Sequence, residues 1–220
     1  MSIIRYLEEN EKKDLPLSVI LFKKIREDIL TGKLRTNEKL TECKICLEYN
    51  VSRTPVREAL MQLEAKGLIK NIPNRGAFVT GFTPQDIRDM TVLRDQAEVT
   101  AVRWAIDRIT DRELDELDET FEFMQFYTQK NDIPKMIDIN MAFHKIIYNA
   151  THNDMLIHNL NAYQLYLRHA NPSNYYAPGY LREVLSEHRD VYVCFSAGDS
   201  EAGAIAMARH MENSKKRKFR

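Results

Sequence analysis

The ten residues VSRTPVREAL, Val51–Leu60, decide the fold of the N-terminal part of the chain. They place Arg53 and Arg57 four residues apart, so that both guanidinium groups project from one face of a helix. Pro55 would lie in the first turn, where its missing N–H group breaks no helical hydrogen bond and its fixed φ angle favours a helix start. The stretch therefore predicts a helix that begins sharply near Ser52 and carries both cations close to its positive end.

The residues on either side of this stretch predict a winged helix-turn-helix. Apolar residues at helical spacing indicate helices over Leu17–Ile29 and Thr41–Tyr49, before the third helix over Ser52–Gly67. The run GLIKNIPNRGAFVTGF then contains two apolar segments around a turn sequence. It predicts a hairpin with strands Leu68–Ile72 and Ala77–Thr80. Three short helices followed by a hairpin are typical of a domain that binds DNA.

The start of the third helix has chemistry suited to double-stranded DNA. Ser52 and Thr54 offer hydroxyl groups that can cap the first N–H groups, and a helix N-terminus attracts phosphate. An arginine can contact both acceptors on a guanine edge in the major groove. Two arginines four residues apart are more often ordinary surface cations. Here the neighbouring helices, and a hairpin tip with Arg75 and Gly76, favour the DNA-binding interpretation.

The chain from Thr83 onward contains helical patterns only. The sequence from Thr110 to Glu113 is a capping box that opens one of these helices. The others are expected over residues 84–107, 134–151, 154–170, 180–197 and 199–214, with residues 171–179 as a loop.

The predicted fold class is mainly α. Residues 1–81 form a winged helix-turn-helix domain with a small β-hairpin wing, and residues 82–214 form an all-α helical bundle. Residues 215–220, KKRKFR, are a basic tail that we expect to be solvated and disordered.

Composition narrows the class of protein. Residues 1–81 carry 15 Lys and Arg against 11 Asp and Glu, whereas residues 82–220 carry 17 against 21, which suggests that only the first part meets a polyanion. No apolar run approaches the roughly 20 residues that cross a bilayer, and the N-terminus is too charged for a secretion signal, so we expect a cytoplasmic protein. Three cysteines argue against a disulfide scaffold, and the single pair Cys43 and Cys46 favours packing over a metal or redox role.

Three histidines of the C-terminal part fall on the apolar faces of three different predicted helices. They are His144, His188 and His210, and Asn140 precedes the first by four residues on the same face. One inward histidine is usually a core residue with a satisfied hydrogen bond, but three could converge on a metal ion. The spacing alone leaves both interpretations open.

The N-terminal pattern resembles the DNA-binding domain of the GntR family of bacterial transcription regulators. The resemblance covers residues 15–80 and rests on the segments LTE, VSRTPVREAL, LEAKGLI and PNRGAFV. It implies that the recognition helix presents Ser52, Arg53, Thr54 and Arg57 to DNA, and that Gly76 lies at a wing tip close to the minor groove. Family members often carry a DNA-contacting Arg at position 43, where this chain has Cys, and Lys44 is the candidate substitute.

Residues 84–214 resemble the FCD domain, the effector-binding domain of the FadR subfamily of these regulators. The segments that carry the resemblance are LRDQAE, NMAFHKII, SEHRDV and MARHM. Many FCD domains bind a divalent ion through an Asp and three His, which implies the ligands Asn140 (in place of the Asp), His144, His188 and His210. Zinc suits imidazole best, and nickel or another first-row ion is an alternative. The resemblance also implies that Arg94 helps to hold the carboxylate of an effector.

Together these features predict a homodimeric transcription regulator, in the first instance a repressor, that binds a palindromic DNA operator. Its operator affinity would be controlled by a small organic acid bound in the metal-containing helical domain. In one alternative the ion itself is the signal. A metal-dependent hydrolase is a further alternative, but the sequence contains no H-E-x-x-H, nucleophile motif or glycine-rich phosphate loop, so we expect no enzymatic activity.

Overall fold

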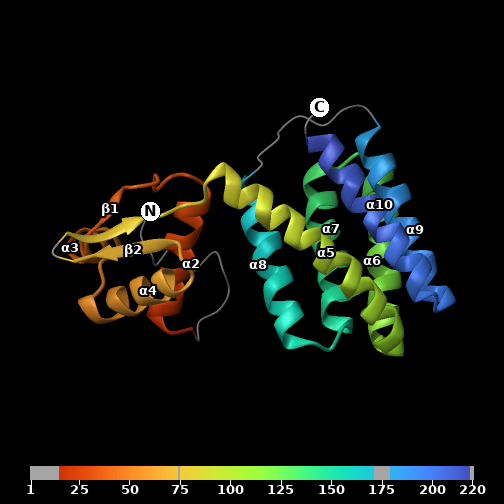
Figure 1. Ribbon diagram of the computed structural model, residues 1–220, viewed down its shortest axis with the longest axis horizontal. Coiled ribbons are helices and arrows are strands. Elements are labelled where there is room, and N and C mark those ends of the chain that lie inside the picture. The colour runs from red at the N-terminus through yellow and green to blue at the C-terminus, as the bar shows by residue number, and fades with distance from the viewer. Residues whose placement is uncertain (1–14, 74, 171–178, 219–220) are drawn as a thin grey trace. The chain divides into compact units, whose positions relative to one another are not determined.

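The computed structural model describes residues 15–73, 75–170 and 179–218, with only the backbone at residues 168–170 and 218. The chain divides into two compact units, Met1–Ile87 and Arg88–Arg220. The boundary expected after residue 81 lies just before helix α5, Pro84–Arg108, whose first residues fall within the first unit (Figure 1). None of the described helices is long and apolar enough to span a bilayer.

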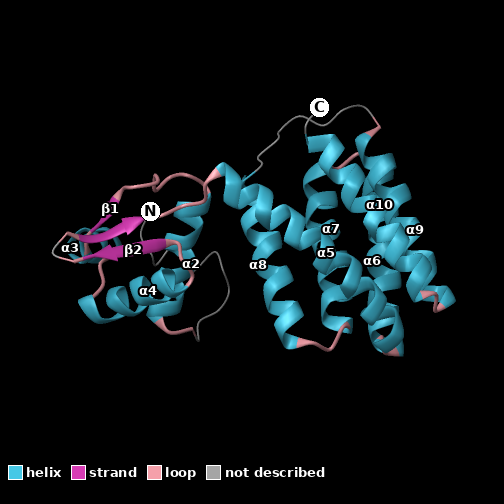
Figure 2. Ribbon diagram, viewed as in Figure 1, coloured by secondary structure: helices cyan, strands magenta, loops and turns pink. Residues whose placement is uncertain are grey.

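The N-terminal unit is a winged helix-turn-helix, as predicted. Its helices are α2 (Leu17–Leu30), α3 (Glu42–Tyr49) and α4 (Arg53–Ala65), and its strands are β1 (Lys39–Leu40), β2 (Ile69–Ile72) and β3 (Gly76–Val79) (Figure 2). The hairpin β2–β3 was expected, but β1 was missed, because a two-residue strand is too short to show an alternating pattern. It pairs with β3 through Lys39 opposite Phe78 and Leu40 opposite Ala77, giving the sheet order β1-β3-β2.

The turn between α3 and α4 is fixed by its end residues. The Thr41 hydroxyl accepts a hydrogen bond from the Lys44 backbone N–H, which caps the start of α3. Asn50 ends α3 with φ at 53°, a left-handed conformation that Asn tolerates better than most residues. The apolar faces of α2 and α4 then pack together over the sheet, and their buried side chains include Leu21, Ile25, Val56, Ala59, Leu63, Leu68 and Val79.

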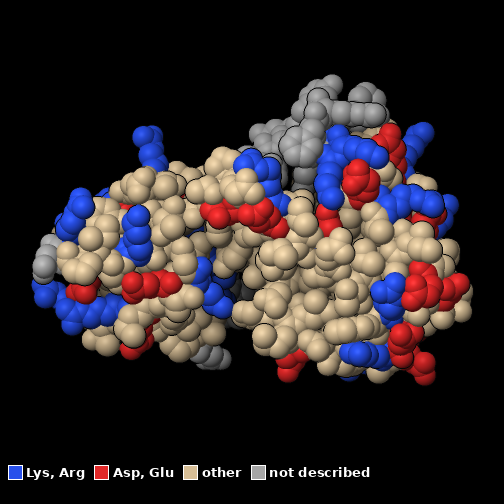
Figure 3. Space-filling view, in the orientation of Figure 1, with Lys and Arg blue, Asp and Glu red and all other residues tan. Residues whose placement is uncertain are grey.

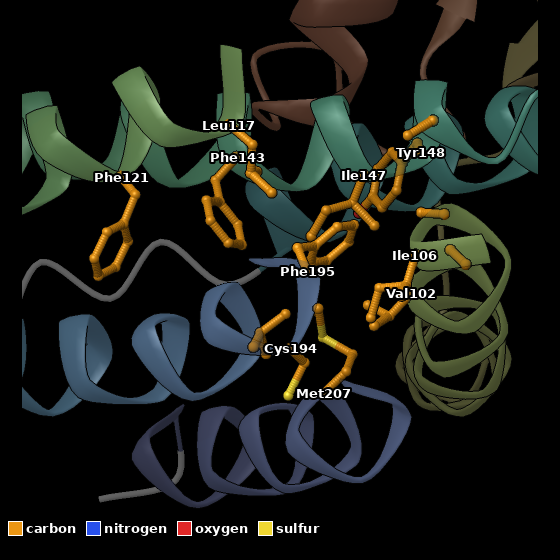
Figure 4. Packing of buried hydrophobic residues seen from close by; sticks show 14 of the residues in the cluster. Val102, Ile106, Leu117, Phe121, Phe143, Ile147, Tyr148, Cys194, Phe195 and Met207 are labelled. Carbon is orange, nitrogen blue, oxygen red and sulfur yellow. The ribbon is translucent and has the colours of Figure 1, made fainter. Parts of the chain in front are cut away.

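The C-terminal unit is an all-α bundle, which confirms the predicted class. Besides α5 it contains α6 (Asp111–Gln129), α7 (Ile133–Ala150), α8 (Asp154–Ala170), α9 (Tyr180–Ala197) and α10 (Ser200–Lys218). The expected capping box at Thr110 and Glu113 is present at the start of α6. Figure 4 shows side chains of α5, α6, α7, α9 and α10 meeting in one core, among them Val102, Phe121, Phe143, Phe195 and Met207.

The last helix differs from the sequence prediction. We expected it to end at Ser214 before a solvated tail, but α10 continues to Lys218. Two of the tail cations make specific ion pairs: Lys215 Nζ lies 2.5 Å from Asp95 Oδ2, and Arg217 Nη1 lies 2.5 Å from Glu187 Oε1. These pairs explain why a run of like charges stays helical here. The last two residues of the expected tail, and residues 171–178 of the expected loop, lie outside the described residues.

Candidate functional site

Three buried histidines converge in the C-terminal unit from three helices. His144 comes from α7, His188 from α9 and His210 from α10, and their potential ligand atoms all lie within 4.8 Å of one another. The ring centroids of His188 and His210 are 4.5 Å apart, and each is 5.4 Å from that of His144. Among the described residues this is the one group of His, Cys, Asp or Glu arranged to hold a metal ion, so Cys43 and Cys46 form no such group.

Each of these imidazoles has its Nδ1 atom held by an oxygen. His188 Nδ1 lies 2.8 Å from the Val184 carbonyl oxygen, which can only accept, so Nδ1 carries the proton and the lone pair is on Nε2. His210 Nδ1 lies 2.9 Å from Glu187 Oε2, and His144 Nδ1 lies 3.1 Å from Glu98 Oε2. This is the arrangement in which metal-binding histidines donate their other ring N–H to a carboxylate or a carbonyl.

His188 Nε2 is buried and has no hydrogen-bond partner among the described residues. Burial, together with the neighbouring His210 and His144, holds the pKa of His188 well below its usual range, so the ring stays neutral. A neutral, buried nitrogen lone pair without a donor is costly in a core unless something binds it. The three histidines therefore fit a metal ion.

Glu98 is a site residue that the sequence prediction missed. It projects from α5, is fully buried, and accepts hydrogen bonds from Tyr148 Oη at 2.5 Å and from Arg94 Nε at 3.0 Å. Burial alone would raise the pKa of Glu98, but its contacts with His144 and Arg94 and its hydrogen bonds outweigh burial and lower the pKa to about 2. Glu98 is therefore an ionised acid that holds His144 in place. Its position among apolar residues of α5, four residues after Arg94, was the signal that could have revealed it.

Arg94 and Asn140 are the other two predicted site residues of this unit. Arg94 lies on α5 with Glu98, and Asn140 lies on α7 with His144. Arg94 is largely buried and its Nη2 lies 2.9 Å from Glu98 Oε1, and although burial opposes its charge, Glu98 raises the Arg94 pKa above its ordinary value. Asn140 is half-buried on α7, one turn before His144 and on the same face. Its role as a fourth ligand stays a prediction.

The recognition helix α4 presents its predicted residues to solvent. Ser52, Arg53 and Thr54 are exposed at its N-terminus. Ser52 occupies the N-cap position but its hydroxyl makes no capping hydrogen bond, contrary to our expectation, so this group is left at the surface. No ion pair among the described residues holds Arg53, whose guanidinium remains available for an external acceptor.

Arg57 differs from Arg53 because it has an internal partner. Its Nε lies 2.9 Å and 3.0 Å from the two carboxylate oxygens of Glu42, the first residue of α3. The pair joins the two helices of the helix-turn-helix across its turn. It orients the Arg57 guanidinium, whose side chain stays 61% exposed.

The wing and α3 supply the other predicted contacts. Arg75 and Gly76 are exposed at the hairpin tip, where Gly76 has φ at 95°, a conformation open to glycine. The Arg75 guanidinium lies 5.7 Å from the centroid of the Phe78 ring. Lys44 is exposed beside Glu38, with the two charged atoms 3.4 Å apart, and Cys43 is exposed next to it. Figure 3 shows Lys and Arg side chains at the end of this unit where α3 and the hairpin turn lie.

The two units match two known domain families. Residues 18–79 match the family described as bacterial regulatory proteins, gntR family, and residues 89–213 match the FCD domain. The chain is 25% identical to the HTH-type transcriptional regulator YdhC of Bacillus subtilis (strain 168), covering 91% of this chain and 90% of that protein. It is 24% identical to the HTH-type transcriptional repressor RspR of Escherichia coli (strain K12), covering 90% and 86%.

Solved structures agree on the fold. E. coli McbR/YncC superposes with a TM-score of 0.71 at 22% sequence identity, over 93% of this chain and 98% of that one. The match confirms the arrangement of a winged helix-turn-helix followed by a helical domain. Because the family and these relatives are regulators, the expectation that the chain is not an enzyme is also confirmed. The chain belongs to the GntR family of DNA-binding bacterial transcription regulators and carries an FCD domain.

Proposed function

We propose that this regulator binds a divalent metal ion through His144, His188 and His210, and that a small organic acid bound there controls its affinity for DNA. The observation that supports the proposal most strongly is the buried Nε2 of His188, which has no hydrogen-bond partner among the described residues and lies among the ligand atoms of the other two histidines. Zinc is the expected ion because neutral imidazole is among its preferred ligands, and nickel is an alternative.

The chemistry of the donor set favours an anionic effector. Three neutral imidazoles leave the charge of a bound divalent ion uncompensated, and Asn140, as a fourth ligand, adds none. Such a centre supplies positive charge and open coordination positions to a carboxylate. Glu98 is already committed to His144, Tyr148 and Arg94, so it does not compete for those positions from its present place.

Arg94 is the second candidate contact for the effector. Its guanidinium is paired with Glu98 Oε1 through Nε and Nη2. A carboxylate that approaches Arg94 must therefore share the guanidinium with Glu98 or displace it. Because Glu98 also contacts His144, an acid bound at Arg94 would change how Glu98 holds this metal ligand. The metal ion and Arg94 are therefore two connected contacts for the effector.

The output of the site is operator binding. We propose a homodimer in which two winged domains bind a palindromic operator, with Arg53, Arg57 and the wing facing DNA. An effector that binds one arrangement of the dimer more tightly shifts the population toward that arrangement. Operator affinity falls if the spacing of the two recognition helices then no longer matches the spacing of the operator half-sites. The expected sign is repression relieved by the acid.

An operator-binding assay tests this proposal. An operator selected from random duplex DNA by the full-length protein is titrated with metal-free protein, with Zn²⁺ and a panel of small carboxylic acids added separately and together. The proposal expects one or more acids to weaken operator binding only when Zn²⁺ is present. If Zn²⁺ alone produces the whole change, the ion is the signal, which is the second candidate function. If acids act equally without Zn²⁺ and on a His188→Asn variant, the metal-centred effector site is wrong.

A further inference from the structure

Glu187 connects one of the candidate metal ligands to the basic end of the chain. It lies on α9 next to His188, but its carboxylate reaches α10 rather than the interior of the histidine cluster. There it accepts hydrogen bonds from His210 Nδ1 at 2.9 Å and from Asn213 Nδ2 at 2.9 Å. Glu187 therefore contacts the Nδ1 edge of the His210 ring.

Arg217 completes this contact from the last described turn of α10. Its Nη1 and Nη2 atoms lie 2.5 Å and 2.7 Å from the two oxygens of Glu187, which is the forked geometry of a strong Arg–carboxylate pair. The side chains of Arg217 and Glu187 are only 14% and 12% exposed. The Arg217 guanidinium also lies 5.9 Å from the centroid of the Tyr180 ring. This is an enclosed ion pair and not a solvated charge run.

The same pattern occurs once more in the unit. Glu98 lies between Arg94 and His144 just as Glu187 lies between Arg217 and His210, whereas His188 is held by a backbone carbonyl. A backbone carbonyl inside a helix cannot move independently, but a carboxylate on a side chain keeps its place only if something else holds it. Arg217 supplies that hold for Glu187 together with Asn213, and Arg217 is the charged member of the two.

We propose that Glu187 is the positioning residue for His210 as a metal ligand, and that Arg217 acts through Glu187, so that the basic end of α10 belongs to the metal centre. This inference rests on the proposed function. Glu187 fixes the ring of His210 with Nε2 toward His144 and His188. The negative charge of Glu187 makes that nitrogen more basic and therefore a stronger metal ligand. Arg217 keeps the carboxylate in that orientation. The C-terminal turn of α10 and the bound ion therefore stabilise each other.

Zn²⁺ affinity of the full-length protein, measured by competition with a chromophoric chelator, tests the assignment. Glu187→Gln should weaken binding by about 10- to 100-fold, the usual effect of losing an outer-shell partner, although Gln can still accept from His210. Arg217→Ala should weaken it less, but clearly. The matched control is Lys216→Ala, which removes a cation from the same turn. The Lys216 side chain is 65% exposed, and among the ion pairs of the described residues it pairs only with Glu212.

The double variant separates a relay from two independent structural effects. If Arg217 acts through Glu187, adding Arg217→Ala to Glu187→Gln should cause little further loss of Zn²⁺ affinity. Additive losses, or affinities equal to wild type in both single variants, would overturn the inference. Circular dichroism on the metal-free variants checks that the helices are intact. A wild-type protein that binds no Zn²⁺ would instead overturn the proposed function on which the inference rests.

Discussion

Arg53 and Arg57 lie on the same recognition helix but are held differently. Arg57 is oriented by Glu42, whereas Arg53 is exposed and makes no ion pair among the described residues. An arginine that is held in place loses less side-chain entropy when it binds a base or a phosphate. Each should therefore matter for operator binding, with Arg57 as the more ordered contact and Arg53 as the one that becomes ordered on DNA.

Removal of either guanidinium should weaken binding to the selected operator. For Arg53→Ala and Arg57→Ala we expect a loss of roughly 1–3 kcal/mol each, the usual value of an arginine that contacts a base edge. Fluorescence anisotropy at fixed salt measures it, with Arg112→Ala as the control, an arginine whose side chain is 90% exposed in the other unit. Unchanged operator affinity in both variants would remove α4 from its assigned role.

The predicted role of Asn140 as a fourth metal ligand can be tested by a single substitution. Replacing its amide by a carboxylate keeps the size and adds a charge to the predicted ligand set. Because loss of an outer-shell partner already changes affinity by about 10- to 100-fold, a charged group in direct contact should raise Zn²⁺ affinity by roughly tenfold or more in Asn140→Asp. Chelator competition measures the change, and an affinity equal to or lower than wild type would show that position 140 does not contact the ion.

The three histidines could be found from their spacing and from the family resemblance, whereas their partners could not. Glu98 and Glu187 lie on helices other than those of the histidines that they hold. Which carboxylate meets which imidazole depends on how α5, α7, α9 and α10 pack, and a periodic apolar pattern fixes only the inward face of each helix. The same reasoning explains why the Glu42 contact to Arg57 was missed.

At the scale of the element, a glycine of α10 lies directly against two side chains of α5. A Cβ atom built at Gly203 would collide with the Cδ1 atom of Ile106 and would lie 3.0 Å from Cγ1 of Val102. Gly203 is inside α10, where a glycine costs about 0.5–1 kcal/mol relative to alanine, so its presence indicates a packing requirement. The absence of a side chain leaves room for Ile106 and Val102 of α5.

Gly203→Ala should therefore destabilise the protein despite its better helix propensity. Overpacking of this kind typically costs about 1–3 kcal/mol, measurable as a lower denaturation midpoint in urea. Ile106→Val removes the Cδ1 atom that the new side chain would clash with, so it is the second substitution to combine with Gly203→Ala. We expect the double variant to be more stable than Gly203→Ala alone, because the clash is relieved. A Gly203→Ala variant as stable as wild type would show that the two helices separate easily.

Helix boundaries could be predicted where local sequence determines them, as at Thr110 and Asn50. The predictions were wrong where contacts with distant residues determine the boundary. The end of α10 is the clearest case. A run of like charges predicts a frayed tail, but ion pairs with Asp95 and Glu187 keep it helical as far as Lys218. Strand β1 is similar, since its two residues become a strand only because β3 offers an edge.

At the scale of the whole molecule, the chain combines a DNA-binding unit with a helical unit that carries a candidate metal centre. The uneven charge of the sequence matches this division of labour: the more basic part holds the recognition helix and the wing, and the more acidic part holds the histidines. Residues 18–79 match the gntR family and residues 89–213 match the FCD domain, and the regulatory function follows from membership of that family. The proposed regulation depends on a metal ion bound at the three histidines of the helical unit.

Isothermal titration of Zn²⁺ into metal-free full-length protein measures whether the three histidines bind an ion. The His188→Asn variant serves as the control, because its amide can still donate to the Val184 carbonyl but lacks the Nε2 lone pair. We predict that wild type binds one ion per chain and that the variant binds far more weakly, while both give the same helical circular dichroism spectrum. Absence of binding by wild type, or equal binding by the two proteins, would contradict the account.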